Sequence, residues 1–139
     1  MRYIGLDLGS RTLGVAVSDK TGLIASSYKI IRHNEEYDRL VEDVKELVKD
    51  LEADAIVLGL PKNMNNSIGF KGELSIEFKE KLEKVLDIPI YLEDERLTTK
   101  VAENILISND TSRKKRKKVI DSMAASVILQ SYLDRRKEK

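Results

Sequence analysis

Residues 2–18 read RYIGLDLGSRTLGVAVS, and the two apolar runs in this stretch, at residues 2–9 and 13–18, decide the fold. The polar connection between the runs is so short that it permits only a hairpin of two antiparallel strands. A third apolar run, at residues 24–31, follows a Thr-Gly turn. The amino-terminal part of the chain therefore predicts three successive antiparallel strands.

The rest of the chain alternates between helical and strand patterns. Residues 55–60 read AIVLGL, a continuous apolar run typical of a strand that is buried on both faces of a parallel sheet. Periodicity predicts, in order, a helix at 35–52, this strand, a helix at 71–86, a strand at 88–92, a helix at 98–106, a loop to 118 and a helix at 119–135. This order predicts an α/β fold: a five-stranded mixed sheet, with three antiparallel strands followed by parallel crossovers, flanked by helices. We expect one domain over residues 1–139, with a frayed tail at 134–139.

Composition limits the chemistry that is available. The chain has no cysteine and a single histidine, His33, so a disulfide or a thiolate metal site cannot form. It has no apolar run of about 18 residues that could span a membrane, and its start lacks a signal-peptide pattern. We therefore expect a cytoplasmic protein with no membrane partner. The net charge is +1, but residues 113–118 read RKKRKK, so the overall balance conceals a basic segment.

Asp7 is a carboxylate within an otherwise apolar strand. Strands disfavour Asp, and burying an unpaired carboxylate is costly. Either Asp7 accepts backbone N–H bonds in the turn at Gly9, or it binds a metal ion at the carboxyl end of its strand, where open α/β sheets place their sites.

Three consecutive acids, Glu93, Asp94 and Glu95, follow the predicted fifth strand. They are a solvated loop, acids favoured by the dipole of the next helix, or metal ligands. Alternation along a strand puts Glu93 and Glu95 on one side and Asp94 on the other. All three can serve one site only if the chain changes direction there.

Asp121 lies near the start of the last predicted helix, three, four and seven residues before Ala124, Ala125 and Ile128. Asp121 is therefore predicted on the helix face that carries small and apolar residues. It is either an acid that compensates the helix dipole or part of a site. The acids from these three distant segments are all predicted at the same end of one sheet. Oxygen ligands of this kind suit a hard divalent cation, Mg²⁺ or Mn²⁺, and two such ions can clamp a phosphodiester.

Several basic and amide side chains are candidates for nucleic-acid binding. The basic run can neutralise backbone phosphates without reading sequence, although a solvated loop has the same composition. Asn63 and Asn65 lie in the loop after the central strand, which is either a ligand-binding loop or a turn-rich connector. Arg96 either contacts phosphate or pairs with the neighbouring acids. The candidates of the basic run are Arg113, Lys114, Lys115, Arg116, Lys117 and Lys118.

Four motifs together resemble a known family. They are GLDLGSRTLGVAVSD at 5–19, VLGLPKNMNNS at 57–67, DERLTT at 94–99, and IDSMAASVILQSYL at 120–133 after the basic run. In this order, over nearly the whole chain, they resemble the YqgF nuclease family, also called RuvX. The resemblance implies an RNase H-like fold related to the RuvC resolvases. It also implies a nuclease that matures the 5′ end of pre-16S ribosomal RNA in ribosome biogenesis, in a family first described as Holliday junction resolvases.

The resemblance also assigns site residues. The acids of the family motifs fall on Asp7, Glu95 and Asp121, which would be both metal ligands and catalytic residues. Analogy with related nucleases favours Glu95 over Asp94, which stays the alternative ligand.

Two positions depart from the family pattern. The family usually has an Arg where this chain has Thr12, so the adjacent Arg11 becomes a candidate substrate contact. Its loop after Pro61 commonly has Asp-Gly where this chain has Asn65-Asn66, and Asn tolerates a positive φ better than most residues.

Four functional hypotheses follow. The first is a metal-dependent endonuclease that acts on structured RNA, above all pre-16S rRNA, in association with the ribosome. The second is a resolvase of branched DNA, which would cut as a symmetric homodimer. The third is a non-catalytic RNA-binding assembly factor, which has no use for buried carboxylates. The fourth is a relative of the sugar and acetate kinases, but 139 residues leave no room for the second domain that closes over ATP.

Overall fold

The computed structural model of the chain describes residues 1–62, 65, 67–95 and 113–137. Side chains of the last helix are described from residue 123 to residue 136. The described elements are β1 (Tyr3–Leu8), β2 (Thr12–Ser18), β3 (Ala25–Arg32), α1 (Tyr37–Leu51), β4 (Ala55–Leu60), α2 (Phe70–Val85), β5 (Ile90–Asp94) and α4 (Arg113–Lys137). The predicted helix at 98–106 lies outside the described residues.

The strands form one five-stranded sheet in the order β3-β2-β1-β4-β5. β1 pairs with β2, and β2 with β3, in antiparallel fashion, whereas β4 runs parallel to both β1 and β5. The mixed sheet predicted from the sequence is thereby confirmed. Since β1, β4 and β5 run in the same direction, their carboxyl ends meet at one edge of the sheet, where Asp7 and Glu95 lie.

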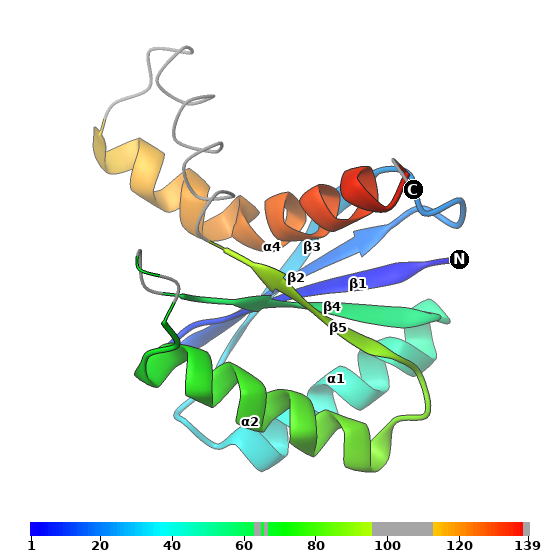
Figure 1. Ribbon diagram of the computed structural model, residues 1–139, viewed down its shortest axis with the longest axis horizontal. Coiled ribbons are helices and arrows are strands. Elements are labelled where there is room, and N and C mark those ends of the chain that lie inside the picture. The colour runs from blue at the N-terminus through cyan, green and yellow to red at the C-terminus, as the bar shows by residue number, and fades with distance from the viewer. Residues whose placement is uncertain (63–64, 66, 96–112, 138–139) are drawn as a thin grey trace.

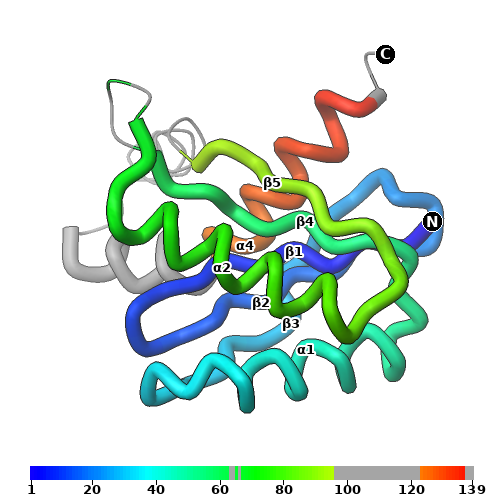
Figure 2. The backbone as a smooth tube through the Cα atoms, turned by 60° about the horizontal axis from the view of Figure 1, so that its bottom comes forward, coloured from blue at the N-terminus to red at the C-terminus, as the bar shows by residue number. Residues whose placement is uncertain are grey.

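Helices cover both faces of the sheet. Figure 1 shows α4 on one face and both α1 and α2 on the other, and Figure 2 shows α1 and α2 side by side. Alternate strand residues divide between the faces, so Ile4 and Leu6 join the core under α1 and α2, while Tyr3 packs with α4. α4 passes very close to β1, because a Cβ at Gly5 would lie 2.7 Å from Leu129 Cβ. No helix in the described ranges has the length and apolar character needed to cross a membrane.

Three sequence predictions about element boundaries are wrong. The basic run 113–118 was expected in a loop, but it forms the first turns of α4, because Lys and Arg are good helix formers. Residues 134–137 were expected to fray, but they continue α4. Strand β5 begins after Pro89, so Glu93 and Asp94 lie inside the strand and not after it.

Side-chain contacts explain why the end of α4 stays helical. The guanidinium of Arg135 lies 2.7 Å from Glu93 on β5. The Arg136 guanidinium lies 5.0 Å from the centre of the Tyr3 ring, and Tyr132 stacks on Tyr91 with ring centres 5.4 Å apart. These contacts attach the last turns of α4 to β1 and β5.

Candidate active site

Asp7 lies near the carboxyl end of β1, on the face covered by α4. Its partner across the hairpin is Gly14 on β2. A Cβ at Gly14 would lie 3.6 Å from Asp7 Cβ and 3.5 Å from the Cβ of Ala125 on α4. The absence of a side chain at Gly14 thus leaves space beside Asp7 under the helix.

Glu95 follows the last residue of β5, and its backbone N–H donates to the Leu60 carbonyl at 3.2 Å. This bond continues the β4–β5 ladder by one residue and fixes the direction of the Glu95 side chain. That side chain lies over Gly59, where a Cβ would be 2.8 Å from both Glu95 Oε1 and Ile128 Cδ1. A larger residue at position 59 would therefore collide with Glu95.

The carboxyl groups of Asp7 and Glu95 are joined by a hydrogen bond. Burial, this hydrogen bond and the negative charges of Asp7 and Asp94 raise the pKa of Glu95 to about 9, against an opposing effect from Lys71. At neutral pH the protonated Glu95 therefore donates to the Asp7 carboxylate. These two half-buried carboxyl groups offer oxygen donors of the kind that divalent cations bind.

The other two acids of β5 have different surroundings. Glu93 is buried on the face covered by α4 and pairs with Arg135. Burial raises the pKa of the Glu93 carboxyl, while the Arg135 guanidinium acts in the opposite direction. Asp94 is half-buried and, by strand alternation, belongs to the other face. Only Glu95 among the three is joined to Asp7.

Asp121 is located only through its backbone. Residue 121 belongs to α4 and precedes Ala125, which lies beside Gly14 and Asp7, by one helical turn. The Asp121 side chain lies outside the described residues. Within the described part of the chain, no group of three or more acidic or histidine side chains converges as a metal site.

The predicted nucleic-acid contacts are more dispersed. Arg11 is exposed in the β1–β2 turn, close in sequence to Asp7. The exposed Asn65 accepts hydrogen bonds through Oδ1 from the Ser67 N–H and hydroxyl, at 3.1 and 2.6 Å, so its side chain stabilises the loop. Asn63, Arg96 and the side chains of the basic run lie outside the described residues.

Three residues of this region were not identified from the sequence. Gly59 makes room for Glu95, and the signal was a glycine inside a fully apolar strand. Lys71, in the first turn of α2, acts electrostatically on Glu95, and no local pattern predicts this. The sequence places His33 at the end of a strand with no acid–base partner, which predicts a surface residue, but His33 is half-buried, with Nε2 3.0 Å from the Gly9 carbonyl.

Comparison with known proteins gives the family. The family model for RuvX, described as Holliday junction resolvase, matches residues 1–135. The chain belongs to the RuvX family. A relative from Staphylococcus carnosus is 55% identical over 135 residues, which cover 96% of this chain and 95% of the relative. One from Bacillus subtilis is 54% identical, with 96% and 98% covered. Both carry the name "Putative pre-16S rRNA nuclease".

Solved structures agree on the fold of this RuvX member. RuvC of T. thermophilus, in complex with a Holliday junction substrate, matches with a TM-score of 0.68 and 15% identity, covering 100% of this chain and 97% of RuvC. A ROK hexokinase from Thermus thermophilus matches with a TM-score of 0.50 and 23% identity, but only 38% of that chain is covered. The RNase H-like fold is therefore confirmed, and the chain is a member of a nuclease family.

Proposed function

We propose that this RuvX protein is a metal-dependent endonuclease that hydrolyses phosphodiester bonds of pre-16S rRNA during maturation of its 5′ end. The observation that carries the proposal is the Asp7–Glu95 carboxyl pair, brought together from β1 and β5 beneath α4. Asp7 raises the pKa of the Glu95 carboxyl, so holding the two groups together makes ionisation of Glu95 unfavourable, which supports a functional role for the pair.

The donor set fits a divalent cation. Asp7 and Glu95 supply carboxylate oxygens, the ligands that Mg²⁺ and Mn²⁺ prefer. We assign Asp121 as a third ligand because its helix position is one turn before Ala125, which lies next to Asp7. A bound divalent ion lowers the pKa of a water molecule to give a nucleophile at neutral pH, and it stabilises the oxygen that leaves the phosphate.

The chain itself supplies position and charge. The β1–β2 and β4–β5 ladders hold the two acids rigidly, since Asp7 is paired within β1 and Glu95 is bonded to Leu60. Lys71 acts on Glu95 as a positive charge, Arg11 lies in the turn after β1, and the sequence of α4 begins with the basic run. These cations would hold backbone phosphates, which gives salt-sensitive binding without sequence reading.

The choice of substrate rests on relatives. RNA is supported by the names of relatives with more than half of their residues identical to this chain. A four-way DNA junction is the second candidate, and the family description supports it. Maturation of ribosomal RNA would place the protein in the cytoplasm with ribosomal precursors as partners, whereas a resolvase would act as a homodimer.

The test is cleavage of an end-labelled pre-16S 5′ leader RNA and of a synthetic four-way junction, each with Mg²⁺, Mn²⁺ or EDTA. The variants are Asp7→Asn, Glu95→Gln and Asp121→Asn, with Asp94→Asn as the matched control on the opposite face of β5. We expect metal-dependent cutting of the RNA that is lost in the first three variants and kept in Asp94→Asn.

Each other result changes the assignment. Symmetric cutting of the junction, with the RNA left intact, would make the protein a resolvase. Cutting that survives Asp7→Asn would remove the carboxyl pair from the mechanism. Loss in Asp94→Asn together with activity in Glu95→Gln would transfer the ligand role to Asp94.

A further inference from the structure

The outer edge of β3 is open. β3 is the last strand on its side of the sheet and pairs only with β2 within the described part of the chain. The His33 N–H donates to the Arg11 carbonyl at 2.9 Å. This bond shows which alternate residues of β3 are hydrogen-bonded to β2. In an antiparallel pair the residues alternate, so the backbone groups of Ile30 and Arg32 point away from β2, toward the open edge.

The open edge has defined ends. A bulge at Tyr28 breaks the register, since Val15 pairs with Lys29 but Ala16 pairs with Ser27. Beyond the bulge, the N–H of Ala25 already donates to Gln130 Oε1 at 2.8 Å. The regular open stretch therefore runs from residue 29 to residue 32, next to the bulge.

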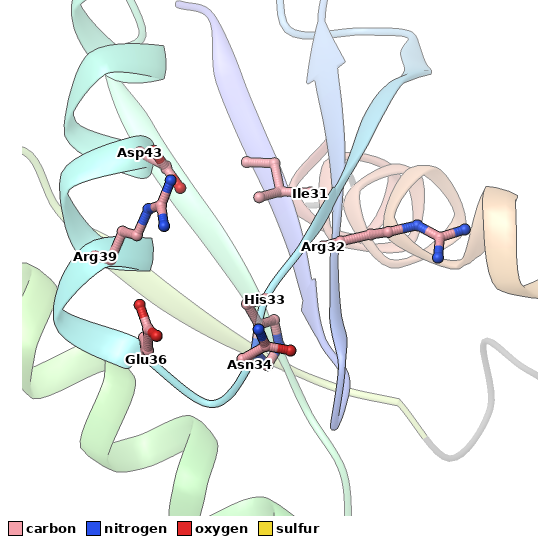
Figure 3. A pocket seen from close by; sticks show the side chains of 7 residues that line it. All are labelled: Ile31, Arg32, His33, Asn34, Glu36, Arg39 and Asp43. Atoms are coloured by element: carbon pink, nitrogen blue, oxygen red, sulfur yellow. The ribbon is translucent and has the colours of Figure 1, made fainter.

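Two adjoining hollows lie between β3 and α1. One has a volume of about 270 Å³ and the other about 170 Å³, and both are lined by Ile31 and Asp43. In Figure 3, Ile31 points from β3 toward α1, while Arg32 points to the other side of the sheet. Together the hollows form a groove beside the open edge, which we call the β3–α1 groove.

The larger hollow carries both charges, with Arg32 and Arg39 beside Glu36 and Asp43, whereas the smaller hollow is acidic along α1. Asp43, Glu46 and Asp50 line the smaller hollow, and Lys29 is the one basic residue among its lining side chains. On the opposite face of the sheet, Ile30 is 46% exposed at the same edge. A strand added to β3 would thus meet three acidic side chains and Lys29 on one of its faces, and Ile30 with Arg32 on the other.

We propose that the β3–α1 groove binds an extended, basic polypeptide segment of another protein, which adds as a strand to the edge of β3. Main-chain hydrogen bonds to Ile30 and Arg32 would give affinity, and alternate side chains would give specificity. Lys or Arg side chains at every second position would lie over Asp43, Glu46 and Asp50. Apolar side chains between them would pack near Ile30.

Charge and geometry select this occupant. A nucleic-acid strand would be repelled by the acidic row, and its backbone offers no ladder of N–H and C=O groups. The groove lies on the opposite face of the sheet from Asp7 and Glu95, so its occupation leaves the carboxyl pair accessible. Extended basic segments fit both the acidic row and the open strand.

The experiment measures binding of a fluorescein-labelled peptide of eight alternating Lys and Val residues, by fluorescence anisotropy. Control peptides are alternating Glu and Val, and four Lys followed by four Val. We expect binding of the first peptide only. Asp43→Asn/Glu46→Gln/Asp50→Asn should weaken it about tenfold, since each exposed ion pair contributes a factor of about two.

Two further measurements separate strand addition from simple charge attraction. Ile30→Pro removes an N–H that faces the open edge, whereas Ile30→Ala keeps it, so we expect loss of binding in the first variant only. Thermal unfolding of both variants checks that the fold is retained. Amide hydrogen exchange at Ile30 and Arg32 in the wild type should slow when the peptide is bound.

Several outcomes would overturn the proposal. They are equal binding of the Lys₄Val₄ peptide, unchanged affinity in the acid-neutralised variant, and unchanged exchange at Ile30 in the presence of bound peptide. A concentration-dependent dimer that dissociates in Ile30→Pro, with no peptide bound, would assign the edge to a second copy of this chain. None of these readouts uses cleavage, so they are independent of the nuclease assignment.

Discussion

The two faces of the sheet are built from different kinds of side chain. Beneath α1 and α2, the strands present large apolar residues such as Leu6 and Leu58, which are fully buried. Beneath α4, the same strands present Asp7, Glu95 and three glycines. Neighbouring residues of one strand therefore have different roles: Leu6 belongs to the larger core, whereas Asp7 lies on the face where a smaller apolar cluster leaves space for charged groups.

This difference explains why the face under α4 tolerates a carboxyl pair. Glycine at 5, 14 and 59 lets α4 and Glu95 approach the sheet closely, but glycine contributes no apolar side chain of its own. The face under α4 keeps an apolar cluster of its own, which includes Leu129 and Leu133, and the larger core on the opposite face adds to this stability. Substitutions on the two faces should thus change stability and activity separately.

The largest expected effect is on stability, from Leu58→Ala in β4. Leu58 is fully buried beneath the helices, so its truncation leaves a cavity and should lower the free energy of unfolding by about 2–5 kcal/mol. Urea denaturation measures this loss. Cleavage per folded molecule should stay at the wild-type level, and a selective loss of catalysis would end the separation of the two faces.

Asp7→Asn should instead reduce cleavage without reducing stability. We expect cleavage to fall by more than about 100-fold, because even an indirect disturbance of a metal ligand typically costs 10- to 100-fold. Stability in EDTA should not fall, because the burial and charge that raise the pKa of Glu95 act against the folded state.

The pH dependence of the same variant sharpens this expectation. A carboxyl group whose folded-state pKa lies near 9, above its unfolded value of 4.5, makes stability fall as pH rises between the two values. Thermal unfolding in EDTA at pH 5 and pH 8 should therefore give a smaller decrease in Asp7→Asn than in the wild type. An equal or larger decrease would mean that Asp7 does not act on Glu95.

Gly59→Ala tests the space beneath Glu95. The new Cβ would lie 2.8 Å from both Glu95 Oε1 and Ile128 Cδ1, so both side chains must move or the backbone of β4 must shift. Overpacking of this kind costs about 1–3 kcal/mol of stability. If Glu95 is displaced from Asp7, cleavage falls as well, whereas a backbone shift that keeps the carboxyl pair would affect only the unfolding midpoint. Comparison of kcat with Tm distinguishes the two outcomes.

The sequence predicts the sheet better than it predicts the site. Apolar runs such as 2–9 and 55–60 give strands directly, and their short connections limit the pairing. Asp7 is detectable as a charge inside an apolar strand, and parity separates Glu95 from Asp94. Gly59 is visible as a glycine inside an apolar strand, but its role depends on the approach of Glu95, and no local pattern shows that Lys71 on α2 acts electrostatically on Glu95.

At the start of α4, by contrast, the local sequence pattern predicts the wrong secondary structure. Six consecutive cations at a helix amino terminus are unfavourable to the helix dipole, so a loop was the natural prediction for 113–118. In the structure the helix includes them. Intrinsic propensity and continuation of the packed helix outweigh the dipole effect, which reaches about 1 kcal/mol at most for an exposed group.

The smallest expected effects on stability come from removing two ion pairs, one on each face of the sheet. Glu93 is buried and Arg135 half-exposed, whereas Lys81 and Asp38, which join α1 to α2 at 2.9 Å, are both exposed. Lys81→Met should not change Tm measurably, because exposed pairs contribute little. Arg135→Met should cost about 1 kcal/mol, a value reduced for the exposure of Arg135, because it leaves a carboxylate buried without its cation.

The direction in which pH changes the stability loss of Arg135→Met shows whether charge or packing causes that loss. Burial already raises the pKa of Glu93, and loss of Arg135 would raise it further. The deficit of Arg135→Met should therefore be small near pH 4 and grow as pH rises toward 7, because the folded state must then either bury an unpaired Glu93 carboxylate or keep a proton that the unfolded chain releases to water. Glu93→Gln/Arg135→Met should recover most of the loss, since no buried charge remains. A deficit that is independent of pH would instead mean that Arg135 contributes through packing on β5.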